Sequence, residues 1–360
     1  MAAPRKPAPL SMKPDLEDAA RRWEAFYAGD IIDRPIVLVR APVPGRPKVP
    51  HLTYRERMFD DIDRLIDRAL ECAESIWHGG ETVPSFYPSI GTDEVAAFCG
   101  AGIRWSEDSG DTNWSVPFVD DGDESLPLKI DPRGALWQRT LALYRRAGDR
   151  LAGRMLLQMP DLHTNMDLLM SARGSERLCM DLIDRPATID RAMVSARAVF
   201  RELWSALSRA AKMDERGYGG WMYSMEGAAT LQCDFSCMIG PAMFRRWVMP
   251  ALVEETEIAR HALYHWDGPE ALKHLDDLAS IPRMHALSYV SGAGRGDNFD
   301  FLSLAKQVQA RGKAAQLWAT PDMIKNHYHP NLRPEKVVYD VWVRTPDEGE
   351  RLLDWLVKNT

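Results

Sequence analysis

Short apolar runs alternate with segments of helical periodicity along almost the whole chain, and this alternation limits the folds open to it. The runs are rich in Val, Leu, Met and aromatic residues, and each is followed by a turn and then an apolar period of about 3.6 residues. Eight such runs can be counted, at 35–40, 82–87, 154–160, 221–227, 262–268, 284–290, 314–320 and 337–343. Because parallel strands need crossover connections, which helices supply, eight alternating pairs predict an α/β fold of the (β/α)8 TIM barrel type.

The segments between the runs have the features of helices. Residues 189–207 place one apolar face along the helix, made of Ile189, Met193, Ala196, Phe200, Leu203, Trp204 and Leu207. Three run ends, at "GPEAL" (268), "TPDMI" (320) and "TPDEG" (345), set an N-cap before a proline at the first helical position. A doubly wound sheet fits less well, because no GxGxxG follows the first run and "GAGRG" (292–296) follows only the sixth.

The 360 residues are expected to form one domain. Residues 1–14 have the composition of a flexible tail, and 15–360 would form a single barrel. The long segment 88–150 after the second run is interpreted as a cap inserted over the top of this barrel.

Charge and cysteine content narrow the possible partners. The chain has 45 Lys and Arg against 52 Asp and Glu, a net charge of -7, and its basic residues are scattered, which argues against a nucleic-acid partner. No apolar run reaches the roughly 20 residues that span a bilayer. Five cysteines without a CxxC pair favour a reduced compartment over a disulfide framework. A cytoplasmic protein that binds no membrane is therefore expected.

Barrels of this type carry their active sites at the carboxyl ends of the strands. In "ALYHWDG" (262–268), His265 and Asp267 share one face of a strand, about 6.5 to 7 Å apart. Such a pair can hold a divalent cation, for which zinc is the best match to mixed N and O ligands. It can also contact a substrate without a metal, or serve structure alone, with Asp267 capping the next helix.

Further polar residues at run ends extend the list of candidates. Asp340 lies in an apolar run, where a carboxylate needs a partner, and that partner is a ligand or Arg344 on the same face. Glu226 or Asp234 is predicted to be functional, and His163 is the residue of "MPDLHTNMD" that capping does not explain. The remaining candidates, which would bind the substrate, are Arg40, Arg344, Trp114 and Trp266.

Several stretches resemble the uroporphyrinogen decarboxylase superfamily. They include "DFSCMIGPAMFRRWVMPAL" (234–252), "YHWDGPEALKHLDDL" (264–278), the "GTDEVAAFCGAGIRW" and "DTNW" segments within 91–114, and "DLLMSARGSERLCMDLIDRP" (167–186). The resemblance points to the methyltransferase-like branch and not to the heme-pathway decarboxylase, whose Arg-Gln-Ala-Gly-Arg-Tyr motif is absent here. In the zinc methyltransferases of this superfamily a His-x-Cys pair and a later Cys bind the ion.

The resemblance implies a metal site of changed composition. His265 matches the first ligand, Asp267 stands where the first Cys would be, and Asp340 is the nearest substitute for the late Cys. Carboxylates leave zinc a harder Lewis acid, suited to an alkoxide, phenolate or amine. The leading hypothesis is a methyltransferase that demethylates a small O- or N-methyl compound and passes the methyl group to a corrinoid on a partner protein. Glu226 or His163, with Asp234 nearby, would handle a proton.

Two other functions stay open. One is a cofactor-free decarboxylase or lyase, in which Arg40 and Arg344 bind the carboxylates of a small acid. The other is a non-catalytic protein that binds a tetrapyrrole or corrinoid. Related barrels often pair, so a homodimer is one expected assembly.

Overall fold

The computed structural model describes residues 5–105, 111–120, 128–292 and 299–360. A mixed α/β architecture results, with a central sheet of seven strands whose order is β2-β1-β11-β10-β9-β8-β7. All neighbours in this sheet are parallel except β2, which runs antiparallel to β1. The strands are β1 (Ile36–Pro42), β2 (Ile76–Gly80), β7 (Ala228–Gln232), β8 (His261–Asp267), β9 (Met284–Val290), β10 (Ala314–Trp318) and β11 (Val337–Trp342).

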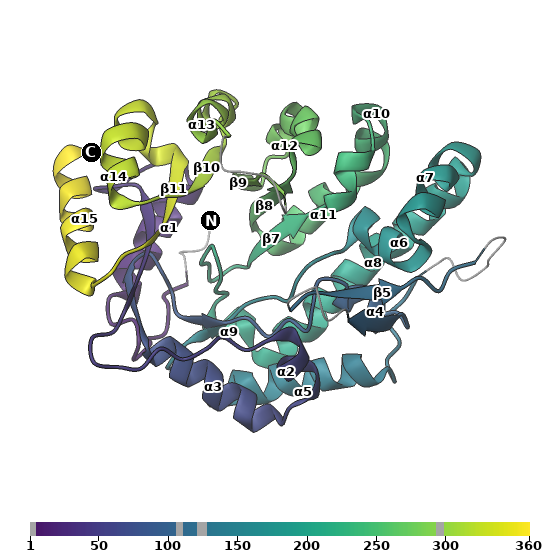
Figure 1. Ribbon diagram of the computed structural model, residues 1–360, viewed down its shortest axis with the longest axis horizontal. Helices are drawn as coiled ribbons and strands as arrows, with labels where there is room; N and C mark the ends of the chain where they lie inside the picture. Colours follow the sequence, from purple (N-terminus) through teal and green to yellow (C-terminus); the bar gives the residue numbers. More distant parts are fainter. Residues whose placement is uncertain (1–4, 106–110, 121–127, 293–298) are drawn as a thin grey trace.

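Helices surround the strands (Figure 1). The α-helices are α1 (Leu16–Tyr27), α2 (Tyr54–Phe59), α3 (Ile62–Glu74), α4 (Glu94–Phe98), α5 (Ala135–Arg150), α6 (Asn165–Arg173), α7 (Ser175–Asp184), α8 (Pro186–Ala211), α9 (Met213–Arg216), α10 (Pro241–Met243), α11 (Met249–Ala259), α12 (Leu275–Ser280), α13 (Phe301–Ala310), α14 (Pro321–Met323) and α15 (Pro346–Asn359). Short helical turns are η2 (Asp234–Met238), η3 (Phe244–Val248), η4 (Pro269–His274), η5 (Ile324–Tyr328), η6 (His329–Asn331) and η7 (Pro334–Lys336).

Most of the predicted elements are present. The apolar face predicted for residues 189–207 is buried in α8, and the hydroxyls of Thr320 and Thr345 cap α14 and α15. Five of the predicted runs form strands with nearly the predicted bounds, namely β1, β8, β9, β10 and β11. The run at 221–227 was wrongly predicted, because the strand β7 begins only at Ala228.

The strands that the structure describes do not form a closed ring. The strands β3 (Ser85–Phe86) and β6 (Leu156–Leu157) pair in parallel with each other, in a two-stranded sheet separate from the central one. Leu157 makes a single parallel bridge to Tyr218, and the chain around this bridge contains Gly217, Gly219 and Gly220. Glycines weaken a strand because they add backbone entropy and no side-chain packing, which accounts for the short pairing here.

The segment 88–150, which was predicted to be a cap, contains α4, a hairpin of β4 (Gly102–Trp105) and β5 (Asn113–Val116), and helix α5. Helix α5 packs between α3 and α8, where Arg146 donates to Asp63 at 2.8 Å. A Cβ atom at Gly148 would lie 2.8 Å from the Cα atom of Ala211, so the contact of α5 with α8 requires a glycine. Residues 293–298, which hold most of the predicted Gly-rich loop, lie outside the described part.

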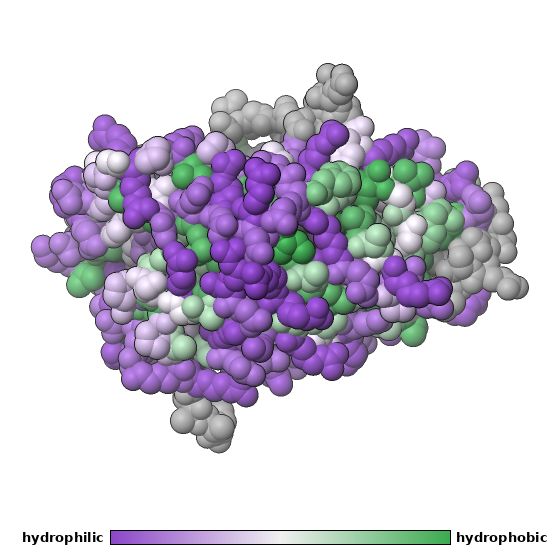
Figure 2. All heavy atoms as spheres, turned by 90° about the horizontal axis from the view of Figure 1, so that it is seen from below, coloured by the Kyte–Doolittle hydropathy of each residue, from purple (hydrophilic) through white to green (hydrophobic). Residues whose placement is uncertain are grey.

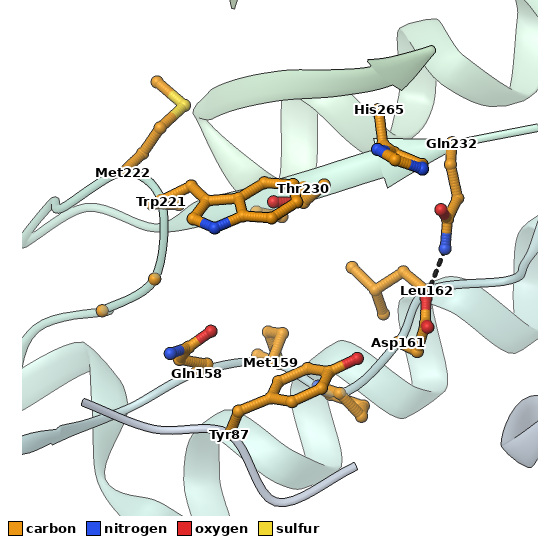
Figure 3. A pocket seen from close by; sticks show the side chains of 15 residues that line it. Tyr87, Gln158, Met159, Asp161, Leu162, Trp221, Met222, Thr230, Gln232 and His265 are labelled. Carbon is orange, nitrogen blue, oxygen red and sulfur yellow. Dashed lines mark hydrogen bonds between the residues drawn. The ribbon is translucent and has the colours of Figure 1, made fainter. Parts of the chain in front are cut away.

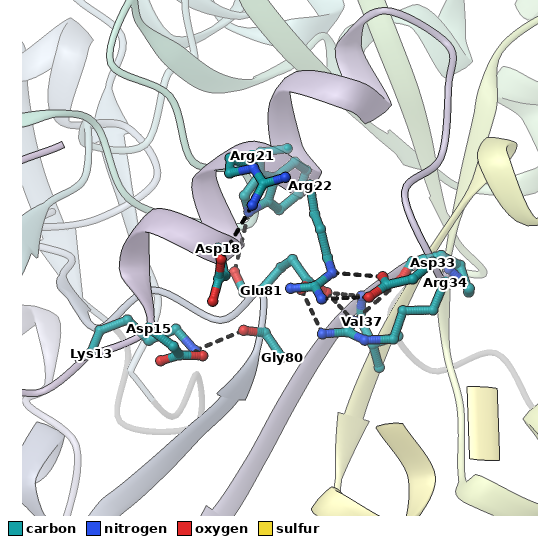
Figure 4. A network of polar contacts seen from close by, with 12 residues as sticks. Lys13, Asp15, Asp18, Arg21, Arg22, Asp33, Arg34, Val37, Gly80 and Glu81 are labelled. Carbon is teal, nitrogen blue, oxygen red and sulfur yellow. Dashed lines mark hydrogen bonds and ion pairs between the residues drawn. The ribbon is translucent and has the colours of Figure 1, made fainter. Parts of the chain in front are cut away.

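The amino-terminal segment is anchored to the sheet. Leu10 and Lys13 are buried, although residues 1–14 were predicted to be a flexible tail, and the Lys13 ammonium donates to the carbonyl of Gly80 at 2.7 Å. Next to it the buried Glu81 accepts two hydrogen bonds from Arg34, at 2.6 and 2.8 Å (Figure 4). Because these groups are buried, removing one partner would leave the other charge without water or a counter-charge, which would destabilise the fold.

The outer surface is mainly hydrophilic, as expected for a chain with many charged residues. Hydrophilic side chains cover most of the face seen in Figure 2, with patches of hydrophobic ones between them. Among the described residues, no helix combines the length and the apolar character that crossing a bilayer requires.

Candidate metal centre and its cavity

Three side chains converge at the carboxyl ends of β7 and β8. Gln232, at the end of β7, is the register partner of His265 on β8, so the residues that follow both positions lie at the same edge of the sheet. His265 and Asp267 are two residues apart on β8 and share a face. Asp234 comes two residues after β7, in the first turn of η2.

Asp234, His265 and Asp267 form a cluster with the geometry of a metal site. One ligand atom from each lies within 4.8 Å of the other two. Each also has a buried atom without a hydrogen-bond partner among the described residues: Asp234 Oδ1, His265 Nδ1 and Asp267 Oδ1. Buried polar atoms are normally satisfied, and an imidazole with two carboxylates is a common set of ligands for a divalent ion. The three residues therefore can hold a metal ion.

Asp340 does not belong to this cluster, contrary to the prediction. Its Oδ1 accepts a hydrogen bond from Arg40 Nη1 at 2.6 Å, and its side chain is 7% exposed. The register places Asp340 opposite Leu38 on β1, so that Arg40 two residues on can reach it. The alternative partner, Arg344, lies beyond the end of β11 with its side chain 92% exposed, and it contacts Glu348.

His163 lies beside the cluster, in the loop that follows β6. Its Nε2 is 3.6 Å from Asp161 Oδ1 and 3.8 Å from Asp234 Oδ2, and the side chain is 9% exposed. Burial by itself lowers the pKa of this imidazole, but the surrounding carboxylates, chiefly Asp161 and Asp167, outweigh it and raise the pKa to about 9. The carboxylates around His163 thus favour its protonated form.

Asp167 supports the turn that carries Asp234. It is fully buried in α6, and its carboxylate accepts the backbone N–H groups of Asp234 and Phe235, each at 2.9 Å. Burial raises its pKa, while the neighbouring His163 opposes this shift. Asp167 was not among the predicted site residues; the signal for it was a carboxylate inside the largely apolar "NMDLLM".

Two more buried carboxylates hold the loop between β6 and α6, and sequence reasoning missed both. Glu94 Oε1 accepts the N–H of Asp161 at 3.0 Å, and burial raises the pKa of Glu94 to about 8. Glu255 accepts from the hydroxyl of Thr164 at 2.8 Å, and burial raises its pKa to about 7. In "LVEETEIA" Glu255 resembles the exposed acids around it, so its sequence gives no signal of burial.

A cavity of about 390 Å³ opens in front of the cluster. His265 and Asp161 line its inner end, where the amide of Gln232 bonds to Asp161 (Figure 3). Trp221 and Tyr87 lie on opposite sides of the space, and both rings point into it. A second cavity of about 610 Å³, lined by Arg40 and Trp342 among others, shares both of these aromatic residues.

Several predicted site residues lie elsewhere. Glu226 is exposed just before β7, at the amino end of the strand, because the strand is displaced from the predicted run. Trp114 is 44% exposed on the β4–β5 hairpin. Trp266 points to the other face of β8 from His265, where its Nε1 donates to the carbonyl of Ala271 at 2.9 Å. None of these three, nor Arg344, lines the cavity in front of the cluster.

Comparisons with known proteins identify a solved structure with a similar fold. No protein-family model matches the chain, and no curated protein matches it. Among solved structures, a methyltransferase from Methanosarcina mazei superposes with a TM-score of 0.59 at 11% sequence identity. The match covers 94% of this chain and 98% of that chain. At so low an identity, the similarity shows that the two chains share a fold.

Proposed function

We propose that the protein is a metal-assisted methyltransferase that demethylates a small O- or N-methyl compound. The observation that carries the proposal is the cluster of Asp234, His265 and Asp267, in which one ligand atom of each residue lies within 4.8 Å of the other two and His265 lines a cavity. The likeness in fold to a methyltransferase supports the same reaction class.

The cluster suits a divalent ion such as zinc. Two carboxylates and one imidazole give it a net charge of about -2, which such an ion cancels. When bound, the ion supplies Lewis acidity toward an oxygen or nitrogen lone pair. An oxygen-rich set of ligands matches the heteroatom of an ether or amine better than a thiolate.

His163 is assigned to proton transfer in place of Glu226. As the methyl group leaves, the bond between carbon and the heteroatom breaks and its electron pair stays on the heteroatom. The protonated His163, next to Asp161 and Asp234, can neutralise the charge that develops there. Asp234, first expected to act in catalysis, is assigned to the metal centre.

A corrinoid on a partner protein is the proposed acceptor of the methyl group. We also infer that the sheet belongs to a (β/α)8 barrel, in which β3, β6 and the segment around Tyr218 complete the ring. The parallel β3–β6 pair and the bridge from Leu157 to Tyr218 support this inference. Such a barrel would open toward the acceptor at the carboxyl ends of its strands.

Metal content and methyl transfer test the proposal together. Protein purified without chelator should carry close to one divalent ion per chain, His265→Ala should lose it, and His327→Ala, which changes an exposed histidine, should keep it. The purified protein should also convert reduced free cobalamin to its methyl form when given a methyl donor, followed by the corrin spectrum. Equal and negligible metal in all three proteins would remove the metal from the mechanism.

A further inference from the structure

Three aromatic rings meet at the amino end of the sheet, at the opposite end of the strands from the metal cluster. Tyr27 is the last residue of α1, His261 is the first residue of β8, and His285 is the second residue of β9. The rings of Tyr27 and His261 stack with their centroids 3.7 Å apart, and the ring of His285 lies 5.1 Å from each of them. The three rings therefore tie α1 to two neighbouring strands of the sheet.

A β-bulge directs His285 toward this contact. Ala262 of β8 pairs with Met284 and Leu263 pairs with Ala286, so His285 is the extra residue of β9. A bulge of this kind re-aims a side chain. Here the backbone N–H of Ala262 donates to Nδ1 of His285 at 3.4 Å. Because a backbone N–H can only donate, this nitrogen has to stay without a proton for the contact to persist.

The same rings hold the chain 218–227, which leads into β7. The hydroxyl of Tyr27 donates to the carbonyl of Tyr223 at 2.6 Å. Nδ1 of the buried His261 lies 2.9 Å from the hydroxyl oxygen of Ser224. Loss of the ring contact would therefore release both the end of α1 and the chain 218–227.

We propose that Tyr27, His261 and His285 form an acid-sensitive latch, which is closed while both imidazoles are neutral and opens when they take up protons. The chain 218–227 carries Trp221, which forms part of the wall of the cavity in front of the metal cluster. The latch at one end of the strands thus maintains the shape of the cavity at the other end. This inference goes beyond the proposed function and does not depend on it, because neither a metal ion nor methyl transfer enters the latch.

The surroundings of the rings supply no excess of negative charge to stabilise a protonated imidazole. The charged groups on the elements packed against the rings are Glu24 of α1, Glu226 before β7, Arg260 after α11, Arg283 before β9 and Lys313 before β10. Of the three cations, Arg283 is paired with Glu257 at 3.1 Å. Two carboxylates thus remain against two cations around the latch.

Burial also disfavours the protonated imidazoles. Burial lowers the pKa of His261 to about 4, and burial together with the neighbouring His261 lowers the pKa of His285 to about 3. An unfolded histidine has a pKa of about 6.5, so the released rings bind protons that the closed latch does not bind. The stability of the latch is therefore fully present above about pH 6.5 and is lost as the pH falls toward the folded values.

Global unfolding responds to acid in a different way. Glu94 and Glu255 have raised pKa values in the folded protein, so a fall from pH 7 to pH 5 favours the folded state through these two groups. Over the same range, opening of the latch should become about 20-fold more favourable for each histidine released, and up to about 400-fold for both. A local opening can therefore be distinguished from a general loss of stability.

Hydrogen exchange of the full chain at pH 7 and pH 5, corrected for the intrinsic exchange rate, tests the latch. The opening constant of peptides from α1 and from 218–227 should rise by about 20-fold or more in acid. The opening constant of β10 (Ala314–Trp318), inside the sheet, should rise less than about threefold. An equal rise in all three segments, or no rise in α1 or in 218–227, would overturn the proposal.

Matched variants identify the groups that take up the protons. His261→Asn and His285→Asn each keep a polar group close to the position of Nδ1 but cannot titrate, so each should reduce the rise between pH 7 and pH 5 by about 20-fold. His327→Asn, which changes an exposed histidine, should keep the wild-type rise. Because the two pH values are compared within each variant, a constant loss of stacking on Tyr27 cancels. Two variants are used so that a folding defect in one, seen by circular dichroism, leaves the other informative, and a folded latch variant with the wild-type rise contradicts the inference.

Discussion

Asp167 accepts the backbone N–H groups of both Asp234 and Phe235 at 2.9 Å, and so fixes the turn that carries Asp234, the third residue of the candidate metal cluster. The carboxylate is fully buried and lies on α6, while the turn belongs to η2. Asp234 follows the end of β7, so hydrogen bonds between strands do not fix its position. Its place beside His265 therefore depends on a residue 67 positions earlier in the chain.

Replacing Asp167 by Asn should weaken metal binding while leaving the three cluster residues intact. One oxygen would become an amide N–H that faces a backbone N–H, and the turn would shift. Loss of such supporting contacts typically lowers metal affinity about 10- to 100-fold. Zinc titration with a competing chelator would measure this. Asp181→Asn is the matched control, because Asp181 is also buried but pairs with Arg173 and Arg185 away from the site; an equal loss of affinity in both variants would contradict the role of Asp167.

The two aspartates that compete for the role of third ligand can be told apart by substitution. Asp234→Asn should lower zinc content and affinity, whereas Asp340→Asn should keep the metal. The second change removes the negative charge that balances the half-buried Arg40, so it should cost about 1–3 kcal/mol of stability. Metal analysis and urea unfolding of both variants would give the two readouts. If Asp340→Asn lost the metal while Asp234→Asn kept it at full occupancy, Asp340 and not Asp234 would be the third ligand.

Two of the three cluster residues could be predicted from the sequence, and the third could not, for a physical reason. His265 and Asp267 could be placed together because strand alternation is local. The choice between Asp234 and Asp340 depended on contacts between distant strands: Asp340 is neutralised by Arg40, 300 residues away in sequence. A carboxylate in an apolar run shows that a partner must exist, but it does not show which one.

The fold was predicted best where strands are long and followed by a capped helix. The threonines before Pro321 and Pro346 cap α14 and α15, as predicted. The prediction was wrong at "WMYSMEG", whose aromatic and Met residues belong to an irregular segment lining the cavity, with Trp221 in its wall. Apolar composition alone does not separate a strand from a pocket wall, and this shift also placed Glu226 at the wrong end of β7.

The buried Glu94 predicts that stability falls as pH rises. The pKa of Glu94 is about 8 in the folded protein, against about 4.3 for an unfolded glutamate. Between these values the folded state holds a proton that the unfolded state releases, so raising the pH favours unfolding by up to about 1.4 kcal/mol per pH unit. Glu255, with a pKa of about 7, adds to the slope over the lower part of this range.

Glu94→Gln removes this proton while keeping an acceptor for the N–H of Asp161. The variant should be less stable or similar at pH 5 and more stable than wild type at pH 8, measured by urea unfolding at both values. Glu226→Gln, an exposed site, serves as the control and should follow the wild-type profile. Parallel profiles for wild type and Glu94→Gln between pH 5 and 8 would rule out this origin of the pH dependence.

Glu81 pairs with Arg34 beside the start of β1, and its removal should destabilise the fold without touching the cavity. The carboxylate bonds to Arg34 and to the N–H of Val37, at 3.0 Å for the latter, and it is 1% exposed (Figure 4). Glu81→Ala would leave the buried Arg34 guanidinium unpaired, a change that costs about 3–5 kcal/mol. Changing both residues, as Glu81→Leu with Arg34→Met, should recover much of this loss, because it removes the uncompensated charge together with its partner. Urea unfolding of the single and double variants would measure how strongly the effects of the two substitutions on stability are coupled. If the double variant is no more stable than Glu81→Ala, the loss of stability comes from lost packing and not from the unpaired charge of Arg34.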